Sequence, residues 1–425
     1  MSLGLTLGLL AVASPASAAS SATSSSSCAK AVKPTKAQLS SSAGISAKEV
    51  RVANISILTG IVPGLFKGAQ VGAEAYFKYL NARGGVNGRK ITLDKFDDGF
   101  SGQRNQQLTQ QALAKDFALV GSMSIFDNFG CKVLAANGAM PDVSVTLDPA
   151  TNSLPNIYSP MPLNQAASLG PYLRIKRAHP KAVRAVGNLV VDSASPKALW
   201  VGQKAAMNHV GYKLAYERYI NPLETNFTPD VINMKRKGVQ LVYLTEGDWQ
   251  IEAAIVNAMA AQHFRPPVLF SEGPVYSRQF VQAVGPVKAQ GLILSQGMAL
   301  YLGEDAKIIP AVKTFNDWVK RTDPKFTPDL FTLFGWTSAQ LFADALRKAG
   351  KHPTRGGVLA ALAKVMHFDA SGLLAPTNPA KKISSNCYLM AELDHGRFVR
   401  TSPKGKGWNC DARQYGVHGY LPKVK

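Results

Sequence analysis

The sequence alternates between short β-branched runs and longer amphipathic stretches, and this alternation limits the possible fold more than any other feature. Residues 50–58 (VRVANISIL) have the length and composition of a strand, and residues 68–82 place apolar side chains at helical spacing. A Gly-Gly pair at 84–85 can end this helix in the left-handed conformation, and Asn-Gly at 87–88 can form a tight turn. A second strand then begins at residues 91–93. The glycines therefore reverse the chain so that the two strands can lie parallel.

The same alternation continues to about residue 295. Further strands are predicted at 117–123, 142–147, 183–191, 213–220, 239–244, 267–271 and 291–295. Helices are predicted at 101–115, 132–140, 196–210, 250–264, 308–322 and 329–349, and a hairpin at 386–393 with 397–401. A Pro-rich passage at 153–163 separates two such series. Strands that alternate with helices form parallel sheets covered on both faces, so we predict an α/β protein with two doubly wound lobes.

Length and composition indicate an exported globular protein. The chain has 425 residues, of which 46% are hydrophobic and 18% are charged, as is typical of folded domains. An apolar run over residues 3–13 precedes Ala-Ser-Ala at 16–18, the small-residue pattern that a signal peptidase cleaves. This run is too short to span a bilayer. We predict a signal peptide over 1–18, a flexible leader over 19–45, and a secreted, periplasmic or cell-surface location.

The cysteines predict disulfides. Four cysteines in an exported chain allow three pairings. Cys387 and Cys410 flank a hairpin-like turn, so we expect them to pair, which leaves Cys28 with Cys131. Neither pair has the spacing of metal ligands. A lipid anchor on Cys28 is disfavoured, because no Leu stands at the third position before it and the apolar run lies well upstream.

The chain is strongly basic, with a formal net charge of +21. Such a charge can attract nucleic acid or an anionic surface. The basic residues are dispersed, however, and the clusters at 175–184 and 234–238 lack the interleaved aromatic residues of a strand-binding groove. We therefore expect solvated faces or weak attraction to an acidic cell envelope, and no nucleic acid as partner.

The sequence lacks the common motifs of catalysis and cofactor binding. Glycines follow the first strand at 60, 64 and 68, which is not the GxGxxG spacing of a dinucleotide-binding turn. No phosphate-binding GxxxxGK[ST] loop, GxSxG elbow or HExxH pair occurs. We therefore expect no cofactor and no metal, and we interpret the protein as a binding protein rather than an enzyme.

Ligands of open α/β sheets bind beyond the carboxyl ends of the strands, and polar side chains stand at these positions in the first series. Ser122 and Ser124 follow the strand predicted at 117–123, with Phe126 beside them, and Thr146 ends the strand predicted at 142–147. Their hydroxyls could hold a ligand carboxylate. Helix capping would explain any single one of them equally well.

In the second series, Glu272 follows the strand predicted at 267–271, and Trp249 and Tyr276 lie near such strand ends. A carboxylate beside aromatic rings could hold a ligand ammonium. We interpret Glu246 and Asp248 as solvated loop acids.

The sequence also resembles a known family. VRVANISILTG, then GAQVGAEAYFKYLNARGGVNGRKITL, and a Gln-rich helix before FALVGS are similar to the extracellular solute-binding proteins of ABC transporters, within the Leu/Ile/Val-binding family of type I periplasmic binding proteins. The resemblance runs from about residue 49 to about 400. It implies two lobes joined by three hinge crossovers near residues 163, 296 and 384. The first lobe would then comprise 46–162 and 297–383, and the second 163–296 and 384–425.

The resemblance also implies how a ligand binds. In members that bind amino acids, hydroxyl and amide groups of the first lobe hold the α-carboxylate, and an acid of the second lobe holds the ammonium. Ser122, Ser124, Thr146 and Glu272 match these positions. Phe126 and its neighbour Asp127 stand where small polar residues are expected, which leaves room for an aromatic or otherwise apolar ligand.

Together these expectations predict a secreted substrate-binding protein that captures a small, carboxylate-bearing solute, amino-acid-like or aromatic, and delivers it to an ABC transporter permease. We expect a monomer that meets the membrane only through the permease or a possible anchor. The alternative is a ligand-sensing protein that signals to a partner.

Overall fold

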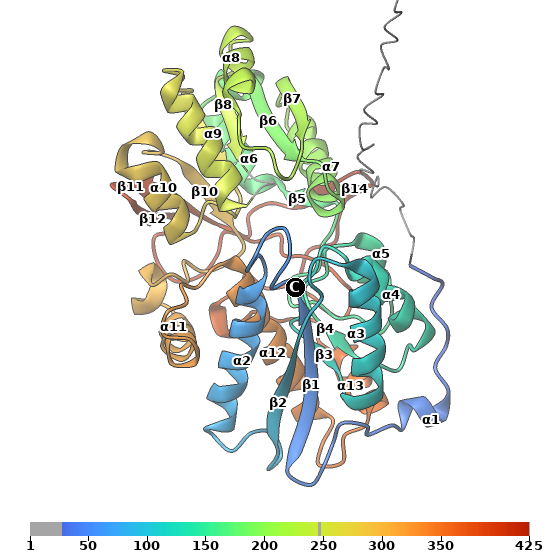
Figure 1. The fold of residues 1–425 in the computed structure, drawn as a ribbon. Coiled ribbons are helices and arrows are strands. Elements are labelled where there is room, and N and C mark those ends of the chain that lie inside the picture. Colours follow the sequence, from blue (N-terminus) through green and yellow to red (C-terminus); the bar gives the residue numbers. More distant parts are fainter. Residues whose placement is uncertain (1–27, 245–247, 425) are drawn as a thin grey trace, which may run out of the picture.

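A computed structural model describes residues 28–244 and 248–424 (Figure 1). The predicted signal peptide, residues 19–27 of the predicted leader, and Glu246 lie outside the described residues. The α/β class with parallel sheets, predicted from the alternating pattern, is confirmed.

The first sheet has the strand order β2-β1-β3-β4, and all its strands run parallel. The side chains of β1 alternate between the two faces of this sheet. Val50 and Val52 face one layer of helices, whereas Ala53 and Ile55 face the opposite layer. We call this sheet with the helices that cover it the first lobe (Figure 1). Its elements are β1 (Glu49–Ser56), β2 (Lys90–Asp97), β3 (Leu119–Val120), β4 (Asp142–Val143), α1 (Lys36–Leu39), α2 (Lys67–Asn81), α3 (Gly102–Lys115), α4 (Asp127–Ala136), α5 (Pro149–Ser153), α11 (Pro310–Thr322), α12 (Leu330–Lys348) and α13 (Arg355–Leu362).

The turn between α2 and β2 has the predicted geometry. Gly84, Gly85, Asn87 and Gly88 all have positive φ, between 50° and 93°. The Gly85 N–H donates to the Leu80 carbonyl and closes the end of α2. A Cβ at Gly85 would lie 1.9 Å from the Arg89 carbonyl oxygen, so only glycine fits there.

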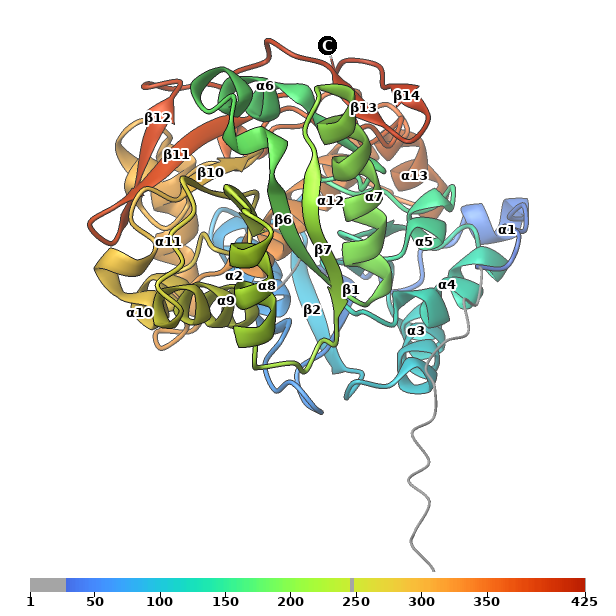
Figure 2. The same cartoon turned by 90° about the horizontal axis from the view of Figure 1, so that it is seen from above.

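The second sheet has the order β12-β11-β10-β9-β8-β6-β7, in which β6 to β10 are parallel and β11 and β12 form the predicted antiparallel hairpin. Helices α6 and α7 cover one face, and α8 to α10 the other (Figure 2). We call this sheet and its helices the second lobe. Its elements are β6 (Val186–Val191), β7 (Leu214–Ile220), β8 (Leu241–Leu244), β9 (Val268–Ser271), β10 (Ile293–Gln296), β11 (Leu389–Asp394), β12 (Arg397–Ser402), α6 (Leu169–Ala178), α7 (Ala194–His209), α8 (Thr228–Arg236), α9 (Trp249–Ala261) and α10 (Arg278–Lys288).

A small antiparallel sheet joins the C-terminal segment to the second lobe. It pairs β13 with β5 and with β14, and the sequence pattern did not predict it. Helices α6, α8 and α10 were not predicted; they contain prolines at 171, 229 and 286. The strands of this sheet are β5 (Ala166–Ser168), β13 (Gln414–Gly416) and β14 (Gly419–Tyr420).

Helix α12 returns to the first lobe and crosses α2 at close range. A Cβ at Gly72 would lie 1.9 Å from the Thr332 carbonyl oxygen, and one at Gly335 would lie 2.0 Å from that of Ala69. Backbones can approach this closely only where glycine leaves the space open. The segment between β10 and β11 of the second sheet therefore completes the core of the first lobe.

Segments that connect the lobes are hydrogen-bonded to each other. The Asn164 side chain donates to the Lys382 carbonyl at 3.0 Å and accepts from the Ser384 N–H at 2.7 Å. The Ala299 N–H donates to the Leu373 carbonyl. Asn164 and Ser384 lie close to the crossovers predicted near 163 and 384, so these two connections lie side by side.

A chain of aromatic contacts also runs from one lobe to the other. Ring centroids are 4.9–6.1 Å apart along the series Tyr76, Trp336, Phe315, Tyr301, Tyr276 and Phe398. An ion pair between Asp305 and Arg400, both side chains almost fully buried, holds the segment after β10 against the hairpin of the second lobe. The lobes are thus joined by packed core on this side.

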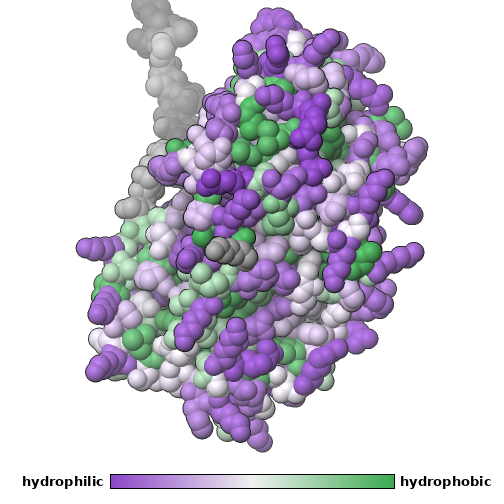
Figure 3. Space-filling view, turned by 180° about the vertical axis from the view of Figure 1, so that it is seen from behind, coloured by the Kyte–Doolittle hydropathy of each residue, from purple (hydrophilic) through white to green (hydrophobic). Residues whose placement is uncertain are grey.

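The surface seen in Figure 3 is largely hydrophilic, and its hydrophobic residues form separate groups. Within the described residues, each helix is too short or too polar to serve as a membrane span.

Candidate functional site

The loops after β3 and β4 are joined by serine hydroxyls. The Ser122 N–H donates to Ser144 Oγ at 3.0 Å, and Ser122 Oγ accepts from the Ile55 N–H at 3.1 Å. At these positions a backbone N–H donates to a serine hydroxyl instead of to a backbone carbonyl. Gly121, with a φ of +66°, also departs from the extended conformation of a strand. Strands β3 and β4 are therefore much shorter than the predicted 117–123 and 142–147, and the polar loops begin earlier.

Ser124 also bonds within the first lobe. Its Oγ donates to Asp98 Oδ2 at 2.5 Å and accepts from the Phe126 N–H at 3.0 Å. Asn105 donates to the same Asp98 oxygen at 3.0 Å. Burial raises the pKa of Asp98 above its usual value, and the hydrogen bond from Ser124 opposes this rise. The hydroxyl of Ser124 thus fixes the end of β2 to the end of β3.

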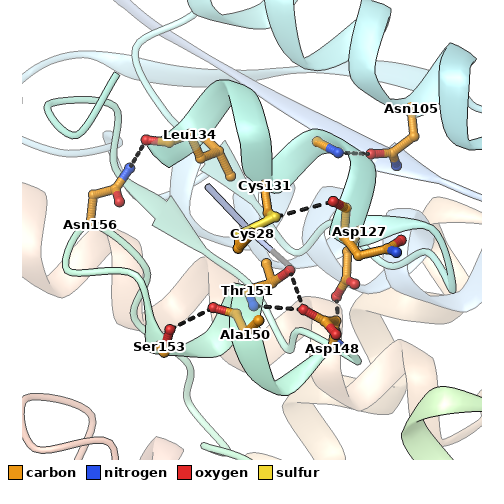
Figure 4. The surroundings of a disulfide bond; sticks show 12 residues. Cys28, Asn105, Asp127, Cys131, Leu134, Asp148, Ala150, Thr151, Ser153 and Asn156 are labelled. Carbon is orange, nitrogen blue, oxygen red and sulfur yellow. Dashed lines mark hydrogen bonds between the residues drawn. A yellow bond between two sulfur atoms is a disulfide. The ribbon is translucent and has the colours of Figure 1, made fainter. Parts of the chain in front are cut away.

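Asp127, the first residue of α4, reaches across to the loop after β4. Its Oδ2 accepts from the Leu147 N–H at 2.6 Å and from the Asp148 N–H at 3.2 Å. Burial raises the pKa of Asp127 to about 7. Asp148 in turn caps α5 by accepting from the Thr151 N–H at 2.8 Å. Figure 4 shows Asp127, Asp148 and Thr151 near the disulfide of Cys28 and Cys131.

A cavity of about 30 Å³ lies beside Asp127, which is room for about one water molecule. Thr146 is buried and lines this cavity, and among the described residues its Oγ1 has no hydrogen-bond partner. Ser122 and Ser124 line the same cavity. The structure therefore brings the hydroxyl-bearing residues predicted in the first lobe together, around a space too small for a solute.

Apolar side chains follow every strand of the first sheet at its carboxyl end. Ile61 and Ile125 are 63% and 39% exposed, and the rings of Phe100 and Phe126 meet edge to face at 5.3 Å. We call this set the apolar rim: Ile61 and Leu65 after β1, Phe100 after β2, Ile125 and Phe126 after β3, and Leu147 after β4. The loop after β1 reaches towards the second lobe (Figure 1).

Glu272 follows β9 in the second lobe, as predicted, and lies among aromatic residues. Its Oε2 accepts from Gln203 Nε2 at 3.2 Å. The hydroxyls of Tyr172 and Tyr243, which are 3.1 Å apart and hydrogen-bonded to each other, lower the pKa of the carboxylate. Burial raises the pKa of Glu272 to about 7, against the effect of these donors. The carboxylate is thus solvated by the protein itself.

The aromatic residues predicted beside Glu272 lie elsewhere. Tyr276 is buried in the aromatic chain between the lobes, and its hydroxyl donates to Glu304 and accepts from the Leu302 N–H. Trp249 begins α9 and is half-buried, and Asp248 caps this helix rather than lying free as a solvated loop acid. The structure therefore does not gather Trp249 and Tyr276 with Glu272 as a single cage.

Sequence reasoning missed the bond from Asp127 to the amides after β4, and the rim residues Ile61 and Phe100. The sequence did contain the information needed to predict Ile61 and Phe100 as site residues, because each of them follows a predicted strand. The hydrogen bond from the Leu147 N–H to the Asp127 side chain joins positions 20 residues apart, so no local sequence pattern predicts it.

Disulfides join Cys28 to Cys131 and Cys387 to Cys410, the pairing that the sequence favoured. The sulfur of Cys28 is therefore bonded to another cysteine in this structure, and it is not free to carry a lipid thioether.

Comparisons with known proteins agree with this architecture. Residues 49–397 match the model of a family described as periplasmic binding protein. The Leu/Ile/Val-binding protein homolog 1 of Brucella melitensis biotype 1 is 26% identical over 310 residues, which cover 68% of this chain and 76% of that protein.

Solved structures are similar at lower identity. A fatty acid ABC transporter substrate-binding protein from Thermomonospora curvata superposes with a TM-score of 0.71 at 18% identity, covering 86% of this chain and 94% of that one. A branched-chain amino acid ABC transporter protein from Thermus thermophilus with bound valine has a TM-score of 0.71 at 16% identity, covering 84% and 96%. At this identity the similarity shows the fold.

Proposed function

Because the chain belongs to the periplasmic binding protein family, we propose that it is the exported substrate-binding component of an ABC transporter. A small solute binds between the lobes, which close on it, and the closed form is recognised by a permease. The proposed lobes are 46–162 with 297–383, and 163–296 with 384–425. The protein acts as a monomer.

The apolar rim is the observation that carries this proposal. Large apolar side chains such as Ile61 are exposed on loops that follow strands, at the edge where open α/β sheets bind ligands. Exposed apolar groups in such a position mark a binding surface. The rim supports a solute with a large apolar body. Leu/Ile/Val-binding relatives and a fatty-acid-binding neighbour, as their names describe them, fit this class.

The function can be tested with protein purified from its native secretion route. Native mass spectrometry should find one small molecule retained per chain. After this molecule is removed by unfolding and refolding, adding it back at 100 times its dissociation constant should stabilise the protein by about 2.7 kcal/mol. The proposal would be contradicted if the purified chain retains no small molecule and if no compound in a screen of small solutes raises its melting temperature.

A further inference from the structure

We infer that Asp127 occupies the backbone amides at which a solute carboxylate would otherwise bind in the first lobe, and that the solute is an apolar molecule without an α-amino-acid head group. This inference rests on the proposed function and specifies the chemical class of its solute.

The geometry at Asp127 is that of a bound anion. One carboxylate oxygen accepts from two consecutive backbone N–H groups, those of Leu147 and Asp148, at 2.6 and 3.2 Å. Consecutive N–H groups in a loop are a common binding site for carboxylate and phosphate. They follow the strand end at which the sequence placed the carboxylate of an amino acid. The protein therefore supplies from its own chain the group that a solute would bring.

A second carboxylate would be repelled at this place. Two unit charges about 4 Å apart interact with roughly 4 kcal/mol at the effective dielectric constant of a protein surface. A hydrogen bond to a charged group contributes only about 1.5–3 kcal/mol. This repulsion is larger than the energy gained from one shared amide hydrogen bond. A solute carboxylate is therefore excluded above about pH 7, where Asp127 is ionised.

Two of the other groups expected to hold an amino acid, Ser124 and Glu272, are also engaged within the protein. Ser122 and Thr146 line the cavity that is too small for a solute. The Ser124 hydroxyl donates to Asp98 Oδ2. Glu272, the expected partner of an ammonium, accepts from Gln203, and the hydroxyls of Tyr172 and Tyr243 lower the pKa of its carboxylate. An amino-acid head group would have to break these contacts to form its own.

The apolar rim, in contrast, is available. Ile61 and Ile125 expose a large part of their surface, and Phe100 and Phe126 present a pair of rings beside Leu147. Covering such side chains stabilises a complex by about 25 cal/mol for each Å² of apolar surface removed from water. Binding in the first lobe is therefore driven by apolar contact, and Asp127 acts as a specificity-determining residue.

Three probes with the same phenylpropyl body test this inference: L-phenylalanine, 3-phenylpropanoate and 3-phenylpropan-1-ol. Isothermal titration of the refolded wild-type chain at pH 8, where Asp127 is ionised, should show that the alcohol binds at least tenfold more tightly than L-phenylalanine. Asp127→Ala frees the two amides, so its affinity for 3-phenylpropanoate should rise at least tenfold while the affinity for the alcohol is unchanged. Asp127→Asn is the matched control, because its amide oxygen can still accept from the loop, and it should gain less than Asp127→Ala.

Asp127→Ser provides a second variant with free amides if Asp127→Ala does not fold, as judged by its circular dichroism and melting curve. Wild-type protein that binds L-phenylalanine as tightly as the alcohol would overturn the inference and leave the capture function standing. Failure of both small variants to gain 3-phenylpropanoate binding would overturn it as well. A gain in the variants with no probe bound by the wild type would support the role of Asp127 and count against capture of this apolar class.

Discussion

Replacing Gly335 by alanine should destabilise the first lobe, although the same change in an exposed helix is stabilising. Alanine favours a helix over glycine by about 1 kcal/mol. In α12, however, the new Cβ would lie 2.0 Å from the Ala69 carbonyl oxygen of α2, where contacts below 3.0 Å do not occur. The helices must separate by more than 1 Å, and overpacking of this kind costs about 1–3 kcal/mol, with larger values for backbone contacts. Because the clash is with backbone, the upper part of this range applies. After the gain of about 1 kcal/mol in helix propensity, the net effect is a loss of about 1–2 kcal/mol or more.

Urea unfolding followed by circular dichroism and tryptophan fluorescence measures this loss. Gly405→Ala is the control, because a Cβ there has no atom within 4 Å, and it should change the free energy of unfolding by less than about 0.5 kcal/mol. If the lobes unfold separately, only the transition of the first lobe should shift. A Gly335→Ala chain as stable as wild type would refute the close crossing of α2 and α12, and with it the assignment of residues 330–348 to the first lobe.

Three further predictions concern stability. Cys28→Ser opens a disulfide to Cys131 across 103 residues and should lower the free energy of unfolding by about 2–4 kcal/mol under oxidising conditions; an unchanged urea midpoint would contradict the pairing. Asp305→Asn leaves the Arg400 guanidinium buried without its counter-charge and should cost about 3–5 kcal/mol, and a cost below 1 kcal/mol would count against the buried ion pair. Glu272 holds its proton more tightly when folded, since its pKa is about 7, so its contribution to stability is present below about pH 4.5 and is lost as pH rises through 7. Between pH 5 and 8 the wild-type free energy of unfolding should therefore fall by up to about 3 kcal/mol because of Glu272, and Glu272→Gln should abolish this part of the fall. If the variant and the wild type show the same dependence of stability on pH, the burial of Glu272 is contradicted.

Much of the fold could be predicted because local patterns specify it. The glycines at 84 and 85 require positive φ, and the period of apolar residues places α2, β6 and α12 within a few residues of their observed bounds. The strands β3 and β4 were predicted too long. Their sequences are apolar enough for longer strands, but Ser122 and Ser144 pair through a side-chain hydroxyl and end the backbone ladder early.

The site was harder to predict than the fold. Ser122, Ser124 and Thr146 do lie around one cavity, because parallel strands end at the same edge of a sheet. The hydrogen-bond partners of Ser122 and Ser124 include Ile55, Asp98 and Ser144, which lie 22 to 67 positions away, and side-chain periodicity holds no information about them. The position of Tyr276 in the connection between the lobes depends on packing against Tyr301 and Phe398, which are separated from it by 25 and 122 positions in the numbering.

Small-angle X-ray scattering of the chain with and without its retained solute tests the central claim most directly. The solute is first identified by native mass spectrometry, removed, and then added back to saturation. If the lobes close on the solute, the radius of gyration should decrease on binding and return to its larger value when the solute is removed. A chain that binds its solute with an unchanged scattering profile would contradict capture between closing lobes.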